Sequence, residues 1–418
     1  MLKKILIFIL INFLFVFPAG AAVKRCSVEE VVNLALQNNL SLQAKKKELE
    51  AIKQDVRIAN QLKNPQFQSN FLIGKVTEGN SSQFGVAVPV EIAKRGVRKR
   101  SALAQYDIVE NEVRAKEHEI KIDVMRAYFD VLYHKSMVHI MQDRENVFKE
   151  MYDIAKEKAQ KSPAYKIDML QADIRHKKQL VILNKEKSQL LNAQFHLNEV
   201  MNMKDTSDMY DTQELYILGD ASILNITLPD YKVIEDTALK YSYAIRIAEN
   251  SIVKSQADLK IARHKAIPDA AVAAGYAFQR SAHTGGAYVG AYMDLPIFTT
   301  YRADVNRAKI VVEKSSLDKE SFENKLKMTL KQEYNEFKYS KENIGYYKEI
   351  LKESEEILKM STNRYRHGET QFLNLMAIEH QRQELLMEYI SAVLVYYDAY
   401  LDLMYNMGHD ILLEEEIL

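Results

Sequence analysis

The sequence predicts a mainly α-helical fold with a small β part, in which a unit of helix, strand, strand, long helix and long helix occurs twice. Two observations predict it. Twelve of the eighteen glycines and prolines after residue 22 fall in two windows, 65–96 and 268–296, so the chain between them is free to form long helices. Segment 28–65 also aligns with 231–268 at a constant shift of 203 residues, which becomes 207 beyond the strands. A period of this size indicates a duplicated half, because solenoid repeats are far shorter.

Segment 1–22 has the order of a secretory signal peptide. Two lysines precede an apolar run from 5 to 17, and small residues follow at 19–22, so we expect cleavage near Ala21 or Ala22. The apolar run of roughly 13 residues is shorter than the stretch of about 20 that crosses a membrane. No later run of about 18 apolar residues exists, so a mature chain in contact with a membrane would need a barrel or a peripheral helix.

Inside each window the apolar period changes from helical to alternating, which predicts two β-hairpins. Strands are expected at about 66–76, 83–90, 269–280 and 286–295, with turns at 79–82 and at Gly285-Gly286. Side chains of the first strand divide between an apolar face and a polar face: Phe67, Ser69, Phe71 and Ile73 against Gln66, Gln68 and Asn70. In the last strand, Tyr288 and Tyr292 share one face.

Strands of about 9 to 11 residues with one apolar face fit the wall of a transmembrane barrel, and a half-exposed soluble sheet is the alternative. Four strands cannot close on themselves, because the smallest barrels have about eight. A barrel would therefore take three copies of the chain and twelve strands.

Two segments without glycine or proline, 97–162 and 164–218, predict long helices over 98–161 and 167–200. Apolar residues recur at a seven-residue spacing in the first of them, as in a coiled-coil seam, with interruptions at Glu110, Glu117 and His134. The first half turns back at Lys161-Ser162-Pro163, and the second at Arg366-His367-Gly368-Glu369. We expect the division 1–22 signal peptide, 23–204 first repeat, 205–228 linker, 229–408 second repeat and 409–418 tail.

Composition and motifs argue against several classes of function. Lys plus Arg equals Asp plus Glu at 57 each, so no basic excess indicates a nucleic-acid partner. The motifs His-Glu-x-x-His, Gly-x-x-x-x-Gly-Lys and Gly-x-Ser-x-Gly are absent, and we expect no enzyme, cofactor or metal site. Cys26 is the only cysteine. It could accept a lipid, but Lys24 and Arg25 before it favour a free thiol.

Several short segments resemble one family. They are Val88-Pro89-Val90-Glu91-Ile92 with Lys94-Arg95-Gly96-Val97-Arg98, then Arg126-Ala127-Tyr128-Phe129-Asp130-Val131-Leu132, Asp294-Leu295-Pro296-Ile297-Phe298 and Arg364-Tyr365-Arg366-His367-Gly368. Their order over residues 28–408 resembles the TolC-like outer-membrane factors, and the segment 88–98 resembles the cobalt, zinc and cadmium efflux branch.

The resemblance implies a homotrimer in the outer membrane, with a twelve-stranded barrel and a helical tunnel across the periplasm. It also implies a periplasmic adaptor and an inner-membrane pump, of the RND type, as partners. The adaptor contact and aperture would lie at the tips of the helical hairpins: Lys161, Ser162, Pro163, Asp168, Arg364, His367, Gly368 and Asn374. Asn374 and Ala377 stand where some relatives place acids, whereas a threefold ring of Asp168 would attract cations.

The predicted function is therefore a passive duct that exports metal cations or drugs. A type I secretion channel and a soluble periplasmic coiled-coil adaptor remain as alternatives. An exported hydrolase has the least support, since no nucleophile stands beside a base.

Overall fold

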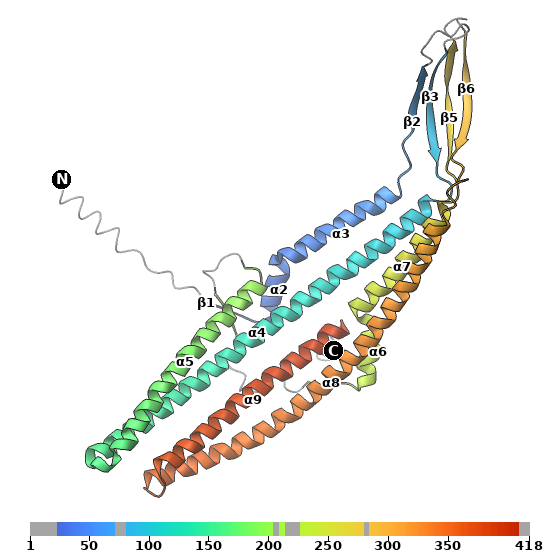
Figure 1. The fold of residues 1–418 in the computed structure, drawn as a ribbon. Helices are drawn as coiled ribbons and strands as arrows, with labels where there is room; N and C mark the ends of the chain where they lie inside the picture. The colour runs from blue at the N-terminus through green and yellow to red at the C-terminus, as the bar shows by residue number, and fades with distance from the viewer. Residues whose placement is uncertain (1–22, 72–80, 204–208, 214–225, 280–283, 409–418) are drawn as a thin grey trace, which may run out of the picture.

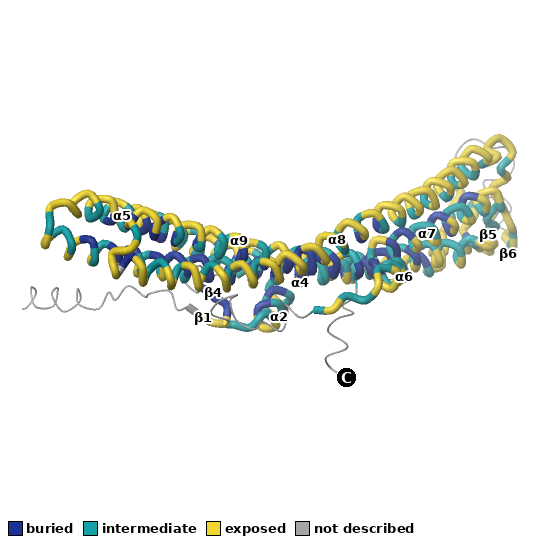
Figure 2. Tube along the Cα trace, turned by 90° about the horizontal axis from the view of Figure 1, so that it is seen from below, coloured by how far each residue is buried: buried dark blue, intermediate teal, exposed yellow. Residues whose placement is uncertain are grey.

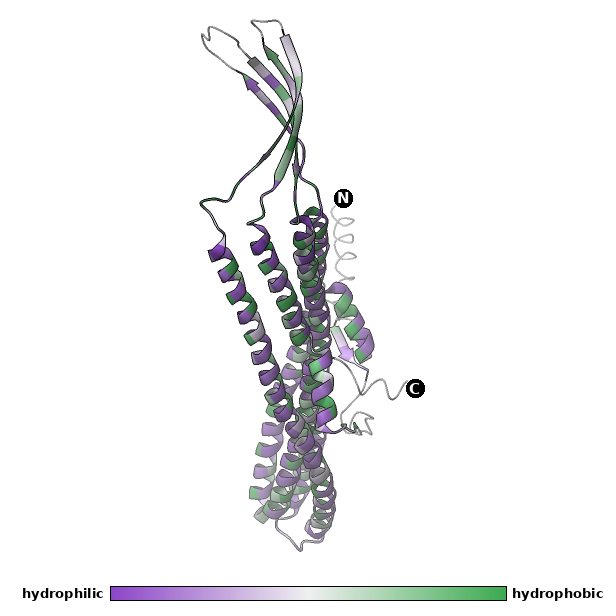
Figure 3. Cartoon of the chain, turned by 90° about the vertical axis from the view of Figure 1, so that its right-hand side faces the viewer, coloured by the Kyte–Doolittle hydropathy of each residue, from purple (hydrophilic) through white to green (hydrophobic). Residues whose placement is uncertain are grey.

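The computed structural model describes residues 23–71, 81–203, 209–213, 226–279 and 284–408. The molecule is a long, thin rod (Figure 1). A β-sheet stands at one end, the turns of two helical hairpins lie at the other, and helices run between them (Figure 3).

The first half of the chain forms two short helices, two strands and a helical hairpin. The helices α2 (Val28–Asn38) and α3 (Leu40–Ala59) lead to β2 (Gln66–Phe71) and β3 (Ser81–Val90). The hairpin consists of α4 (Arg95–Lys161), a short turn η1 (Pro163–Tyr165) and α5 (Lys166–Val200). A capping box starts α2, in which the Ser27 hydroxyl accepts from the Glu30 amide and the Glu30 carboxylate accepts from the Ser27 amide.

The second half repeats this order. It contains α6 (Tyr231–Tyr241), α7 (Tyr243–His264), β5 (Ala270–Gln279), β6 (Thr284–Met293), α8 (Arg302–Arg366) and α9 (Phe372–Met407). The break between the two short helices falls at Asn39 in one half and at Ser242 in the other, which reproduces the shift found in the sequence. The starts of α4 and α8 reproduce the larger shift that follows the strands. The predicted duplicated, mainly helical fold is confirmed.

All four long strands join one antiparallel sheet in the order β2-β3-β5-β6. The expected strand bounds need correction in both hairpins, because β3 begins at Ser81, inside the expected turn 79–82, and β6 begins at Thr284, two residues earlier than expected. Gly285 and Gly286 are not the turn, because they pair with Phe278 and Ala277 inside the ladder. Of the first strand and its turn, residues 72–80 lie outside the described residues.

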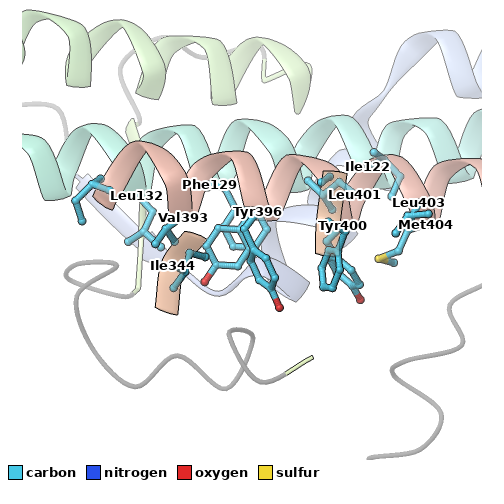
Figure 4. Close-up of a cluster of buried hydrophobic side chains, with 14 of the residues drawn as sticks. Ile122, Phe129, Leu132, Ile344, Val393, Tyr396, Tyr400, Leu401, Leu403 and Met404 are labelled. Carbon is cyan, nitrogen blue, oxygen red and sulfur yellow. The ribbon is translucent and has the colours of Figure 1, made fainter. Parts of the chain in front are cut away.

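The main hydrophobic core joins the two halves, since side chains of α4 pack against side chains of α8 and α9 (Figure 4). Phe129 of α4 stacks on Tyr397 of α9 with ring centroids 4.2 Å apart, and Phe337 of α8 lies 4.6 Å from Tyr396. Burial in Figure 2 follows α4, whereas α5 and α8 carry long exposed faces. The helix α4 packs against α5, α7 and α9, so it is the central helix of the chain.

A second, two-stranded sheet was not predicted. The strand β1 (Val23–Cys26) pairs in parallel with β4 (Met209–Thr212), which lies in the segment 205–228 expected as a linker. The Tyr128 hydroxyl of α4 donates to the Cys26 carbonyl at 3.0 Å and accepts from the Gln213 amide at 3.1 Å. Segment 23–26 is thereby fixed to α4 near the middle of the rod (Figure 1).

Candidate functional site

The sheet has two faces of opposite character, as the sequence predicted. Register places large exposed apolar side chains on one face: Phe67, Phe71, Phe84, Val86, Val88, Val90, Val272, Tyr276, Phe278, Val289 and Met293. The opposite face carries polar and small residues: Gln66, Gln68, Asn70, Gln83, Gly85, Ala87, Ala271, Ala273, Gly275, Ala277, Tyr288 and Tyr292. Soluble monomers rarely expose an apolar face of this extent, so the sheet has the form of a wall between an apolar and an aqueous medium.

The junction between sheet and helices is held by a partly buried ion pair. Both Nη atoms of Arg98 donate to the Glu91 carboxylate, at 2.8 and 3.1 Å, and only 4% of the Glu91 side chain is exposed. Arg98 also donates to the carbonyls of Ala59 and Gln61, at 2.9 and 3.1 Å. The hydrogen bonds from Arg98 hold the pKa of Glu91 below its usual value.

A second pair of contacts ties the other hairpin to the same junction. Asp269, just before β5, lies 3.1 Å from the Lys63 ammonium and 3.0 Å from the Lys94 ammonium. Lys63 also lies 3.5 Å from Glu91. The segment 88–98, which carries the resemblance to a cation-efflux branch, therefore has a structural role in this chain. Its residues Glu91 and Arg98 hold α3, β3 and α4 together.

The first hairpin tip reverses the chain without a glycine. Ser162 is extended (φ −153°, ψ 130°) and its amide donates to the Lys158 carbonyl at 3.0 Å. Pro163 then opens the short turn η1, where its fixed φ suits the first helical position. Lys161 is exposed and pairs with Glu157 at 2.6 Å. The tip presents to solvent both the charged Lys161 and the apolar side chains of Tyr165 and Ile167.

The second tip reverses by a different device. Gly368 has φ +78°, its amide donates to Tyr365, and the Glu369 amide donates to Arg364. This is a Schellman motif, which favours glycine because its αL position strains other residues. His367, the C-cap residue of α8, is exposed, as is the Arg364 side chain.

Sequence reasoning missed the residue that joins the tips, Tyr365. It is buried in a cluster that unites α4, α5, α8 and α9: Phe148, Met151, Ala155, Ala172, Tyr365, Phe372, Leu375 and Met376. The Lys158 ammonium of α4 lies 4.0 Å from the centroid of the Tyr365 ring. Burial, and next the carboxylate of Asp168, raise the pKa of the Tyr365 phenol. Tyr365 lies inside the segment 364–368 that carries the family resemblance, and its aromatic ring among Arg364, Arg366 and His367 was the signal.

The expected tip residues are thus brought to one end of the rod, but they do not form one cluster. Asp168 is half-buried, and its charge contributes to the raised pKa of the Tyr365 phenol. Asn374 is exposed on the first turn of α9, where its amide donates to the Gln371 carbonyl. The second tip offers no acid at that position.

Histidines of the long hairpin are engaged in carboxylate contacts within the protein. His134 of α4 lies 2.7 Å from Glu186 of α5, and His176 of α5 lies 2.7 Å from Glu145 of α4. Over the residues that the structure describes, no group of three or more His, Cys, Asp or Glu is arranged to hold a metal ion. Within the same residues, every helix is too short or too polar to cross a membrane.

A two-faced sheet at one end of a rod and a pair of helical hairpins at the other is an arrangement that can be compared with known families. The outer membrane efflux protein family model matches residues 31–203 and 235–405, one stretch in each half. The chain belongs to the outer membrane efflux protein family, and the predicted family is confirmed.

Solved structures agree on the fold. The chain is similar to CusC, with a TM-score of 0.78 and 15% identity over 95% of this chain and 96% of that one. The Campylobacter jejuni CmeC outer membrane channel gives a TM-score of 0.70 and 15% identity over 91% and 85%. The open state of the Neisseria gonorrhoeae MtrE outer membrane channel gives 0.70 and 18% over 91% and 88%. No curated protein matches the sequence.

Proposed function

We propose that the chain is one of three identical subunits of an outer-membrane duct, exported by its signal peptide, that passes solutes from a periplasmic adaptor and an inner-membrane pump to the exterior. The single observation that carries the proposal is the sheet, which has one apolar face, one polar face and two open edges. Its edge strands are β2 and β6. Because four strands are too few to close, three copies supply the twelve strands of one barrel.

The helices also support a ring of three copies. An exposed apolar stripe follows α5 from the tip upward: Ile167, Leu170, Ile174, Val181, Leu191 and Phe195. A second stripe follows α8 down to its tip: Met328, Tyr339, Tyr346, Ile350, Ile357 and Met360. Successive members are mostly separated by one, two or three whole helical turns, so each stripe lies along one helical face.

The two stripes cover similar lengths and both reach the tips, so α5 of one copy can pack against α8 of the next. Since the stripes belong to different helices, the contact is heterologous, and a heterologous contact closes into a ring when the rotation allows it. Three such contacts would build the helical tunnel below the barrel.

The tips are the proposed contact with the adaptor. Lys161, Arg364 and His367 stand exposed there and can meet polar or acidic side chains of a partner. In a threefold ring, Asp168 would place three carboxylates near the aperture and favour cations. Asn374 adds no charge, so the aperture would carry one acidic ring.

For the cargo we propose metal cations, on the resemblance of segment 88–98 to the cation-efflux branch. Deletion of the gene should then raise sensitivity to zinc, cobalt or copper and leave sensitivity to a panel of drugs unchanged. Raised drug sensitivity without any metal effect would overturn the cargo, and loss of one secreted protein would favour a type I secretion channel instead.

The duct itself is tested by reconstitution. The purified mature chain is expected to form trimers in detergent and discrete conductance steps in a planar bilayer. Absence of both would refute the duct. Recovery of the protein in the soluble periplasm, with none in the outer membrane, would favour the soluble coiled-coil adaptor.

A further inference from the structure

Two tyrosines of β6 lie over the polar face of the sheet, above a floor of very small residues. Tyr288 belongs to a row across the sheet in which Gly275 of β5 and Gly85 of β3 are successive partners. A Cβ atom built on Gly85 would meet the Tyr288 hydroxyl and lie 3.2 Å from its Cζ. One built on Gly275 would lie 2.7 Å from the Tyr288 Cε1. The ring therefore lies flat across both glycines.

Tyr292 crosses the same face at a slant. Its hydroxyl accepts a hydrogen bond of 3.1 Å from Gln68 Nε2, although Gln68 is on the far strand, β2. Tyr292 pairs with Ala271 of β5, whereas Gln68 pairs with Gly85 of β3. The contact between them therefore runs diagonally across β5 and β3 and passes over Ala273 and Ala87. These two alanines are 6% and 0% exposed, although the sheet is a single layer.

A matching contact exists on the apolar face. Tyr276 of β5 covers Gly285 of β6, where an added Cβ would lie 2.6 Å from the Tyr276 Cε1 and 2.7 Å from its Cζ. The sheet thus holds one tyrosine over glycine on each side, which supplies an internal control for any effect that depends on the face.

We propose that Gly85, with Gly275 beside it, sets the bore of the strand part of the duct, because it holds the Tyr288 ring flat against the channel wall while Gln68 holds Tyr292 down. The inference rests on the proposed trimeric duct. A strand spacing of about 4.8 Å and a tilt of about 40° give a twelve-stranded barrel a backbone radius of about 12 Å. An upright tyrosine reaches roughly half of that radius, and three copies would each contribute one.

The test is the single-channel conductance of the reconstituted full mature chain. Gly85→Val should push the ring upright and lower the conductance about twofold, given the radius above. The double variant Gly85→Val/Tyr288→Ala should restore it, because the displaced ring is gone. The matched control Gly285→Val disturbs Tyr276 on the opposite face and should conduct like the wild type. Gly275→Ala is avoided, because its Cβ would also meet the Phe84 carbonyl of the backbone.

A second variant keeps the inference testable if Gly85→Val fails to assemble. In a Cys26→Ser background, Tyr288→Cys should react with a charged, water-soluble thiol reagent and lose current, whereas Tyr276→Cys should keep its current. Current loss with Tyr276→Cys instead, or with neither, would overturn the assignment of the channel face.

The outcomes separate the two proposals. A wild type without conductance refutes the duct and the bore together. A conducting wild type with an equally conducting Gly85→Val, or a double variant that conducts as poorly as Gly85→Val alone, overturns only the role of Gly85 and Tyr288.

Discussion

Replacement of Arg98 by alanine should loosen the junction between the sheet and the long helices. The variant leaves the Glu91 carboxylate, 4% exposed, without its two guanidinium hydrogen bonds. Hydrogen bonds to charged groups contribute about 1.5–3 kcal/mol each in mutational series. Lys63 remains 3.5 Å from the carboxylate, and 37% of the Arg98 side chain already meets water, so the net loss is smaller than the sum.

We expect a local loss of about 2 kcal/mol, which corresponds to roughly 30-fold faster amide exchange over the first turns of α4. Hydrogen exchange followed by mass spectrometry measures this directly on the peptide that covers 95–104. The control is Arg114→Ala, whose partner Glu110 is a surface residue of the same helix at 3.3 Å. That exposed pair should contribute less than about 1 kcal/mol. Equal exchange in the two variants would refute the account of the junction.

The same pair makes a prediction about pH. Since the folded pKa of Glu91 is lowered, its contribution is fully present above the ordinary carboxyl pKa of about 4.5 and is lost as pH falls through the folded value. The protection factor of the amides at the start of α4, which is the intrinsic exchange rate at each pH divided by the observed rate, should therefore fall below about pH 4.5 in the wild type. Glu91→Gln should have a lower protection factor at pH 7 and show a weaker pH dependence. A wild-type profile that matches that of Glu91→Gln would exclude Glu91 as the titrating group.

Three further predictions concern the rod. Phe129→Ala removes the ring stacked on Tyr397 and should cost about 3–5 kcal/mol, visible as a lower thermal midpoint by circular dichroism; an unchanged midpoint would contradict a core that joins the halves. Burial raises the pKa of Glu333 to about 7, so stability should fall as pH rises from about 4.5 to 7, and Glu333→Gln should melt higher than wild type at pH 8 but not at pH 4. Lipid attachment at Cys26 would require cleavage just before it and would remove Val23, Lys24 and Arg25, which pair with β4. We therefore expect an intact-mass measurement to find these three residues present and no acyl chain.

Local patterns were enough to predict the duplicated unit, the faces of the strands and the place of the tips. Alternation fixes which side chains share a face whatever the exact bounds, so Phe67 and Gln68 were placed on opposite faces correctly. Glycine and proline likewise mark the ends of the long helices, because their effect on the backbone is local. The family resemblance then added the arrangement in the envelope.

Contacts between distant segments were beyond such reasoning. Gly285-Gly286 has the composition of a turn, but pairing with β5 and the cover of the Tyr276 ring keep it in the strand. The strands β1 and β4 are very short and are separated along the chain by both hairpin helices of the first half, so no local signal announces their pairing. The burial of Tyr365 likewise depends on α4 and α9 meeting at the tip.

The open edges of the sheet have a consequence for how the protein is made. Hydrocarbon offers no partner to an unpaired backbone amide or carbonyl, and β2 and β6 each present such a row in a single chain. A lone subunit therefore gains little by entering the bilayer, while in water its bare edges invite pairing with any passing strand. In the proposed trimeric duct, association has to precede or accompany insertion, so the slow stage of biogenesis should be the meeting of three chains and not the folding of one.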